Sequence, residues 1–361
     1  MLSAEEIDNW HDGEPPPPPR PFKPLLEVVG LMKHFPIKGG LLGQTRGVVR
    51  AVDGVEFNVL AGETLGIVGE SGCGKSTTAR LLMSLIEPDA GTILFDGKAA
   101  GSPALPMKAY RAQVQMVFQD SYASLNPRLT VEDSIAFGPT VHGVSRNDAI
   151  ARARKLLDRV GLAPTRFAGR YPHELSGGQR QRINIARALA LEPRVLILDE
   201  AVSALDKSVE AQVLNLLLDL KEEFGLTYVF ISHDLEVVRY MADRVLVMYL
   251  GRVAEIGPTD ELYRASRHPY TTALLGSMLS MDPDKRTTAA PLAGDPPNPI
   301  DPPPGCRFHT RCTFAEAVCS ARAPDLGAIG ATDVASIHRA ACHMADPTSK
   351  HSRASYAMGQ Q

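Results

Sequence analysis

The chain has 361 residues, long enough for two or three domains at about 100–200 residues each. With 44% hydrophobic and 22% charged residues, it has the composition of a soluble globular protein that can bury a core. The 38 Lys and Arg against 41 Asp and Glu give a net charge of −3, which argues against a nucleic-acid-binding protein. No uncharged apolar run reaches the ~18 residues that a membrane span needs, and the N-terminus lacks signal-peptide features, so we expect a cytosolic chain.

The first 24 residues are expected to form a disordered tail, because an acidic start is followed by consecutive prolines from Pro15 to Pro19. Residues 26–35 predict a strand, and the glycines within 36–50 predict a flexible insertion. From there to about residue 250, short apolar runs typical of strands alternate with helical patterns. The predicted strands are 55–60, 64–68, 92–95, 114–118, 195–198, 227–231 and 244–249.

This alternation indicates an α/β fold with a largely parallel sheet. Residues 208–224 place apolar side chains at helical spacing, which predicts one face packed on the sheet. Residues 132–191 are helical throughout, which indicates a helical insert. Beyond residue 282, closely spaced prolines predict a linker, and a cysteine-bearing segment and a disordered polar tail at 346–361 follow.

A phosphate-binding loop is predicted at residues 69–77 (GESGCGKST), which fit G-x-x-x-x-G-K-[ST] between an apolar strand and a helical stretch. Glycines let successive backbone N–H groups converge on phosphate oxygens, and the following helix points its positive end at them. Lys75 is expected to reach the β- and γ-phosphates and Ser76 to bind Mg²⁺. The alternative is a glycine turn with a solvated lysine. The predicted nucleotide-binding residues here are Gly69, Glu70, Ser71, Gly72, Cys73, Gly74, Lys75, Ser76 and Thr77.

Two acidic residues end the apolar run 195–198. Such a run is typical of a buried strand whose carboxyl end reaches the ligand crevice. Asp199 is predicted to bind Mg²⁺, and Glu200 to act as the general base that takes a proton from an attacking water. The alternative is an ordinary strand that ends in a polar turn. Within the phosphate loop, Cys73 is either a reactive thiol or, as we prefer, a small filler.

The sequence LSGGQ (175–179) opens another helical stretch, with Ser176 as a natural N-cap. Alone it predicts only a loop and a cap. Placed between the phosphate loop and the acidic strand end, it resembles the signature of the ATP-binding cassette (ABC) ATPases. The other family motifs follow in order, and the resemblance covers roughly residues 26–265. The residues that carry these motifs are Phe35, Gln119, Ser176, Gly177, Gly178, Gln179, Asp206 and His233.

The resemblance implies a P-loop ABC ATPase domain at 25–265, with a mixed sheet core, an antiparallel β subdomain and a helical subdomain at about 120–190. It implies that Gln119 binds the metal and the γ-phosphate, that His233 contacts the γ-phosphate, and that Phe35 stacks on adenine. Two such cassettes pair head to tail, so the 176–179 signature would contact ATP held by the partner. Asp206 would communicate across that dimer. Ala201 departs from the family, which commonly has proline there.

Residues 267–271 (RHPYT) resemble the motif that follows the cassette in oligopeptide and dipeptide importer ATPases. A cysteine-bearing domain at 266–345 resembles that subfamily's end domain. The resemblance implies a second ATPase subunit, expected to be a paralogue, two transmembrane permease subunits and an extracytoplasmic solute-binding protein. It implies a peripheral location on the cytoplasmic face of the membrane. Peptides are the favoured cargo; nickel complexes or glutathione are alternatives, as is a soluble cassette protein that acts on ribosomes or DNA.

Four of the five cysteines follow the spacing C-x5-C-x6-C-x22-C. Four thiols suit a [4Fe–4S] cluster, and the resemblance supports one, because some family members bind such a cluster there. A structural zinc is the alternative, although its usual ligand spacing is tighter. Reduced thiols that pack a small module are a third possibility. The cysteine module could also sense redox state or iron and gate the ATPase, although nothing in the sequence requires it. These cysteines are Cys306, Cys312, Cys319 and Cys342.

Overall fold

The computed structural model describes residues 23–39, 44–277, 297–326 and 338–354. Residues 1–22 of the predicted N-terminal tail and much of the proline-rich linker lie outside these ranges. The strands are β1 Leu26–Gly39, β2 Gln44–Val59, β3 Thr64–Val68, β4 Ala90–Phe95, β5 Lys98–Ala99, β6 Val114–Val117, β7 Val195–Asp199, β8 Thr227–Ile231, β9 Arg244–Tyr249, β10 Arg252–Pro258 and β11 Arg339–Ala340. The α-helices are α2 Lys75–Leu82, α3 Met107–Gln113, α4 Val131–Val141, α5 Arg146–Arg159, α6 Pro164–Phe167, α7 Gly177–Leu189, α8 Lys207–Phe224, α9 Leu235–Met241, α10 Thr259–Arg264, α11 Pro269–Gly276 and α12 Ala317–Ala321.

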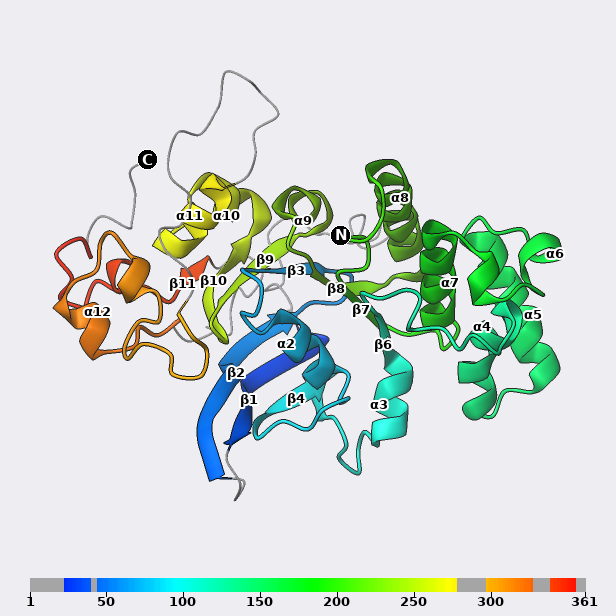
Figure 1. Ribbon diagram of the computed structural model, residues 1–361, viewed down its shortest axis with the longest axis horizontal. Helices are drawn as coiled ribbons and strands as arrows, with labels where there is room; N and C mark the ends of the chain where they lie inside the picture. Colours follow the sequence, from blue (N-terminus) through cyan, green and yellow to red (C-terminus); the bar gives the residue numbers. More distant parts are fainter. Residues whose placement is uncertain (1–22, 40–43, 278–296, 327–337, 355–361) are drawn as a thin grey trace, which may run out of the picture.

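A mixed sheet with the order β11-β10-β9-β3-β8-β7-β6 forms the centre of the molecule (Figure 1). The strands from β9 to β6 are parallel, whereas β10 runs antiparallel to both of its neighbours, β9 and β11, at one edge. The carboxyl ends of β3, β6, β7 and β8 therefore meet at the same edge of the sheet, where ligands bind in open α/β sheets. The predicted α/β fold class is confirmed.

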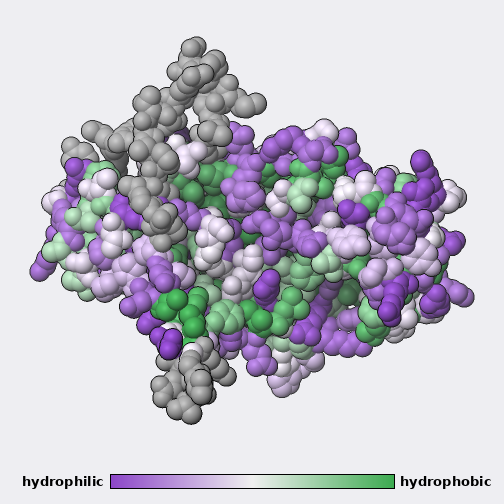
Figure 2. All heavy atoms as spheres, viewed as in Figure 1, coloured by the Kyte–Doolittle hydropathy of each residue, from purple (hydrophilic) through white to green (hydrophobic). Residues whose placement is uncertain are grey.

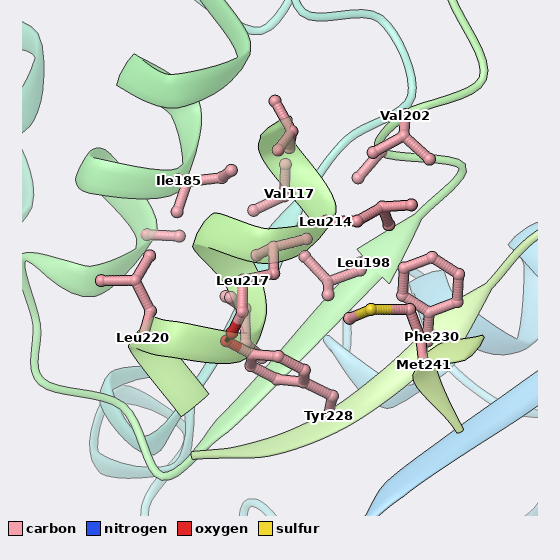
Figure 3. Packing of buried hydrophobic residues seen from close by; sticks show 14 of the residues in the cluster. Val117, Ile185, Leu198, Val202, Leu214, Leu217, Leu220, Tyr228, Phe230 and Met241 are labelled. Carbon is pink, nitrogen blue, oxygen red and sulfur yellow. Dashed lines mark hydrogen bonds between the residues drawn. The ribbon is translucent and has the colours of Figure 1, made fainter. Parts of the chain in front are cut away.

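Both faces of this sheet are buried, which explains its continuous apolar strands. In β8, Tyr228 and Phe230 belong to one hydrophobic cluster, while Val229 and Ile231 belong to the cluster on the opposite face. Figure 3 shows the first cluster, where Leu217 of α8 lies beside Tyr228. The Tyr228 hydroxyl donates a hydrogen bond of 2.8 Å to the Leu217 carbonyl oxygen, which fixes the helix on the sheet.

A second, antiparallel sheet has the order β2-β1-β4-β5. The prediction of a flexible insertion at 36–50 is wrong for the described residues of this stretch, because β1 and β2 pair there as strands, with Phe35 opposite Val49. Gly47 permits close packing, because a Cβ at this position would lie 2.6 Å from Cγ2 of Ile300. Gly47 thus lets the C-terminal segment approach the hairpin.

The helices α4, α5 and α7 pack on one another beyond β6, which agrees with the predicted helical insert (Figure 1). The chain then returns to the central sheet. The strand β10 was missed by the sequence analysis, because Arg252, Glu255 and Gly257 interrupt its apolar pattern.

The C-terminal segment joins the cassette, since β11 extends the central sheet beside β10. The prediction of a disordered tail from residue 346 is wrong for residues 346–354, which pack against the rest of the segment. Ser349 and His351 are buried, with 2% and 4% of their surface exposed. Their polar atoms find internal partners: His351 Nε2 lies 2.9 Å from the Phe314 carbonyl oxygen. Hydrogen bonding of this kind lets polar residues pack inside a small module.

Within the described ranges, no helix has both the length and the apolar character needed to cross a bilayer. Figure 2 shows hydrophilic side chains over most of the visible described surface, with apolar side chains in smaller patches.

Candidate functional site

The predicted phosphate loop lies between β3 and α2, at the carboxyl edge of the central sheet. Residues 69–74 form the loop, and Lys75, Ser76 and Thr77 form the first turn of α2. Gly74 has φ of 112°, and a Cβ there would lie 2.2 Å from the Ala51 carbonyl oxygen. Only glycine fits this close approach of two backbones. The first glycine, Gly69, is equally confined, because a Cβ at that position would lie 2.2 Å from the Met248 carbonyl oxygen.

The Lys75 ammonium folds over the loop and is almost fully buried. Its Nζ donates to the carbonyl oxygens of Gly69 at 2.7 Å and Glu70 at 3.2 Å. The positive charge is therefore held where the loop N–H groups and the N-terminus of α2 converge, which suits a phosphate group.

The Ser76 hydroxyl donates to Oδ1 of Asp199 at 3.1 Å, which joins the phosphate loop to the end of β7. Burial raises the pKa of Asp199, the Ser76 hydrogen bond opposes that shift, and the neighbouring Glu200 charge adds to it. A cation beside this carboxylate would relieve the desolvation cost. One hydroxyl and one carboxylate oxygen are the hard ligands that Mg²⁺ prefers, so these two residues fit the predicted Mg²⁺ site.

Three predicted catalytic residues meet beyond the ends of β6, β7 and β8. Nε2 of Gln119 donates to Oε2 of Glu200 at 2.8 Å, and Nδ1 of His233 lies 3.4 Å from the same oxygen. Glu200 has φ of 47°, a conformation uncommon outside glycine and often found at functional sites. The arrangement places one carboxylate between an amide and an imidazole.

The signature residues 176–179 begin α7. The Ser176 hydroxyl accepts from the Gln179 N–H at 3.3 Å, and Oε1 of Gln179 accepts from the Ser176 N–H at 3.0 Å, which forms a capping box. A Cβ on Gly178 would lie 2.5 Å from Val209 Cγ1, so this glycine permits close packing on α8. In the part of the chain that the structure describes, no hydrogen bond or ion pair links 176–179 to the phosphate loop.

The remaining predicted residues are Asp206, Phe35 and Cys73. Asp206 caps α8 by accepting from the Val209 N–H at 2.9 Å, and this hydrogen bond lowers its pKa. Phe35 is half-exposed on β1. Burial raises the pKa of the Cys73 thiol, which favours the filler role over a reactive thiolate.

Two further residues that the sequence analysis did not assign to the site contact the phosphate loop. The Tyr270 hydroxyl accepts from the Glu70 N–H at 2.9 Å, and Arg311 forms an ion pair with the Glu70 carboxylate. The motif at 267–271 marked Tyr270 as notable but gave no sign of this contact. Arg311 lies 241 residues from Glu70 and carried no local signal.

The four clustered cysteines line one cavity of about 20 Å³, room for about one water molecule. All four are free thiols. Burial and the neighbouring cysteines raise the pKa of Cys306 to about 11, and burial raises that of Cys342 to about 12, so both are protonated at neutral pH. The donor set suits a metal centre. As the side chains lie, however, no three His, Cys, Asp or Glu residues of the described ranges are grouped closely enough to hold a metal ion. The predicted iron–sulfur cluster is therefore not shown by this arrangement, and it would require the four thiols to move closer together.

Two family models match the sequence. Residues 52–203 match the ABC transporter model, and residues 254–319 match the C-terminal region of oligopeptide/dipeptide transporters. The second match spans the RHPYT motif and three of the four clustered cysteines.

Curated relatives match most of the chain. It is 52% identical to a probable peptide ABC transporter ATP-binding protein, y4tS, of Sinorhizobium fredii, over 84% of this chain and 86% of that one. It is 49% identical to the oligopeptide transport ATP-binding protein AppF of Bacillus subtilis, over 89% and 97%. It is 46% identical to the di/tripeptide transport ATP-binding protein DppF of Pseudomonas aeruginosa, over 87% and 97%.

Solved structures match the cassette. The TM-score is 0.57 to cbiO1 of Clostridium perfringens, part of the ABC transporter complex cbiONQ, at 31% identity over 67% of this chain and 91% of that one. It is also 0.57 to the ATP-binding cassette MJ0796, a dimer bound to ADP and Pi, at 29% identity over 65% and 98%. The chain therefore belongs to the ABC transporter family, as an ATPase subunit that carries the oligopeptide/dipeptide C-terminal region.

Proposed function

We propose that this chain hydrolyses ATP together with a second cassette and so energises the import of peptides through membrane subunits. The observation that carries this proposal is the meeting of Gln119, Glu200 and His233 beside the phosphate loop. Glu200 takes a proton from the attacking water, Gln119 contacts the γ-phosphate as well as Glu200, and His233 donates to the γ-phosphate. General-base assistance of this kind contributes about 10²–10⁴ in rate.

The phosphate loop and Lys75 bind the triphosphate, and Ser76 and Asp199 hold Mg²⁺, with Gln119 as a further metal contact. Mg²⁺ neutralises part of the phosphate charge when it is bound. Phe35 is proposed to offer an aromatic face to adenine, because its ring is partly exposed on β1.

The signature residues need a second cassette. Among the described residues, no hydrogen bond or ion pair joins Ser176 or Gly178 to this chain's own phosphate loop, and the similar cassette MJ0796 is a dimer in its ADP- and Pi-bound structure. We propose that the helix N-terminus at Ser176 closes on ATP held by a paralogous partner, and that Asp206 couples the two sites. ATP is then shared by two helix N-termini only while the dimer is shut.

Peptide import is proposed from the relatives, which are called peptide, oligopeptide and di/tripeptide transport proteins. The proposed complex contains two permease subunits and a solute-binding protein, with this chain on the cytoplasmic face of the membrane. The test is to co-purify the complex, reconstitute it in vesicles and measure ATP hydrolysis with candidate solutes. We expect stimulation by peptides. Stimulation by nickel complexes or glutathione alone, or a chain that associates with no membrane subunit, would contradict the proposal.

For the cysteine cavity, we propose a [4Fe–4S] cluster, with zinc as the alternative. The support is the set of four thiols around one cavity, and binding would require the side chains to draw together as their protons leave. Anaerobically purified protein is assayed for iron, sulfide, zinc and visible absorbance. Iron and sulfide with absorbance are expected; zinc alone supports the alternative, and protein free of both metals would refute a metal centre.

A further inference from the structure

Glu70 of the phosphate loop is held by an arginine from the cysteine-bearing segment. The two terminal nitrogens of Arg311 donate to the two carboxylate oxygens of Glu70 at 2.9 and 3.1 Å. The Arg311 side chain is 5% exposed and that of Glu70 is 23% exposed. A bidentate pair between planar groups fixes both distance and orientation, and partial burial limits its screening by water.

The backbone of Glu70 is held by a second residue beyond the cassette core. Its N–H donates to the Tyr270 hydroxyl at 2.9 Å. Tyr270 is fully buried, and its ring centroid lies 4.5 Å from that of Tyr249 and 5.5 Å from that of Phe308. The Tyr249 hydroxyl in turn accepts from Arg311 at 3.3 Å. Side chain and backbone of Glu70 are thus anchored to one aromatic cluster.

This anchor continues to the thiols. Arg311 ends a short 3-10 helix, His309–Arg311, that lies between Cys306 and Cys312. The Cys306 N–H donates to the Cys319 carbonyl oxygen at 2.7 Å, and the His309 N–H donates to the Cys306 carbonyl oxygen at 3.0 Å. A displacement of these cysteines therefore moves the backbone that carries Arg311.

At the other end, Glu70 is linked to the group that binds phosphate. Its carbonyl oxygen accepts from Nζ of Lys75 at 3.2 Å, so a shift of Glu70 moves a partner of the ammonium. Its carboxylate would also repel the triphosphate if it were not neutralised by Arg311, because like charges at short range disfavour each other.

We propose that Arg311 is a positioning residue for the phosphate loop, which acts through Glu70 and couples the cysteine-bearing segment to MgATP binding. This inference rests on the proposed assignment of the loop and Lys75 to ATP. It assigns the C-terminal segment a role in the nucleotide site of its own chain, in addition to any metal that the thiols hold.

The test measures KM for MgATP and kcat in the full-chain complex. For Arg311→Gln we expect KM to rise roughly tenfold, the factor for a free-energy difference of ~1.4 kcal/mol, which is at the lower end for a hydrogen bond to a charged group. We expect kcat to change much less. Arg311→Lys should recover only part of the loss, because an ammonium cannot pair with both oxygens in the geometry of a guanidinium.

A double-mutant cycle separates positioning from a general structural effect. In the Glu70→Gln background, Arg311→Gln should leave KM nearly unchanged, because the carboxylate that pairs with Arg311 has already been removed. The matched control is Arg322→Gln in the same segment, whose ion pair with Asp346 at 3.5 Å is largely exposed and should not affect KM. If Arg311→Gln does not fold, Arg311→Lys takes its place in the cycle.

Lys75→Ala distinguishes the proposed ATP site from the proposed positioning role of Arg311. Unchanged MgATP binding in Lys75→Ala would refute the assigned nucleotide site itself. Loss of binding in Lys75→Ala with an unchanged KM in folded Arg311 variants would overturn the positioning role alone. An equal rise of KM for Arg311→Gln with and without Glu70 would also overturn it.

Discussion

The Glu200→Gln substitution tests the assigned general base with little change in shape. Glutamine is isosteric with glutamate, and its side-chain carbonyl oxygen can still accept from Nε2 of Gln119, which lies 2.8 Å from the native carboxylate. The substitution removes the negative charge that would receive a proton. The neighbouring carboxylate of Asp199 is a poor substitute, because it is buried and accepts from Ser76 at 3.1 Å.

The expected loss follows from the role of the residue. Removing a general base lowers kcat by about 10²–10⁴, or ~3–5 kcal/mol in activation free energy. Since the buried Asp199 carboxylate already accepts a hydrogen bond from Ser76, we expect a loss in the upper part of this range. MgATP binding should be retained, because Lys75 and Ser76 are unchanged. Phosphate release at saturating MgATP gives kcat, and equilibrium dialysis with labelled MgATP gives the affinity.

The matched control is Glu222→Gln, an exposed position on α8 away from the site, which should hydrolyse ATP at the native rate. Native-like turnover by Glu200→Gln would refute the assignment of the base. Loss of both turnover and MgATP binding would show instead that the carboxylate is needed for the shape of the site.

Three further predictions concern stability. Gly74→Ala should cost about 1–3 kcal/mol in urea unfolding and abolish MgATP binding, since its positive φ and the Ala51 carbonyl oxygen leave no room for a Cβ. Tyr228→Phe should cost about 1 kcal/mol in the same assay, because a buried hydrogen bond to α8 is lost. Burial lowers the pKa of His268 to about 4, and its Nδ1 accepts from the Tyr270 N–H, so the neutral ring is the folded form. The neutral His268 ring should therefore stabilise the fold fully above about pH 6.5, and this contribution should be lost as the pH falls towards 4. In His268→Asn, the unfolding midpoint should depend less on pH over this range. A steeper pH dependence in the variant would contradict this reasoning.

The sequence predicted the central strands well. The bounds predicted for β3, β8 and β9 agree with the structure, because a strand buried on both faces is a continuous apolar run that polar turns delimit. The phosphate loop could be predicted from the sequence equally well, since the strand, the glycines and the helix are contiguous in the chain. Glu200 was identified from the acidic end of an apolar strand, and Gln119 and His233 through motif order; the structure shows that the three side chains meet.

The C-terminal segment was less predictable. The strand β11 has only two residues, and its pairing with β10 depends on a partner more than 80 positions earlier. His351 is buried with a hydrogen bond to the distant Phe314 carbonyl oxygen, whereas its local sequence is polar. The Arg311–Glu70 pair joins two ordinary charged residues 241 positions apart, so no local pattern distinguishes it from a solvated charge.

The most direct test of the central claim is the stoichiometry of MgATP binding by the folded chain, compared with Lys75→Ala and Ser76→Ala. We predict one MgATP per native chain, no measurable binding by Lys75→Ala, and binding by Ser76→Ala that has lost its dependence on Mg²⁺. A native chain that is folded yet binds no MgATP, or a Lys75→Ala variant that binds it as tightly as the native chain, would contradict the assignment of this loop as the ATP site.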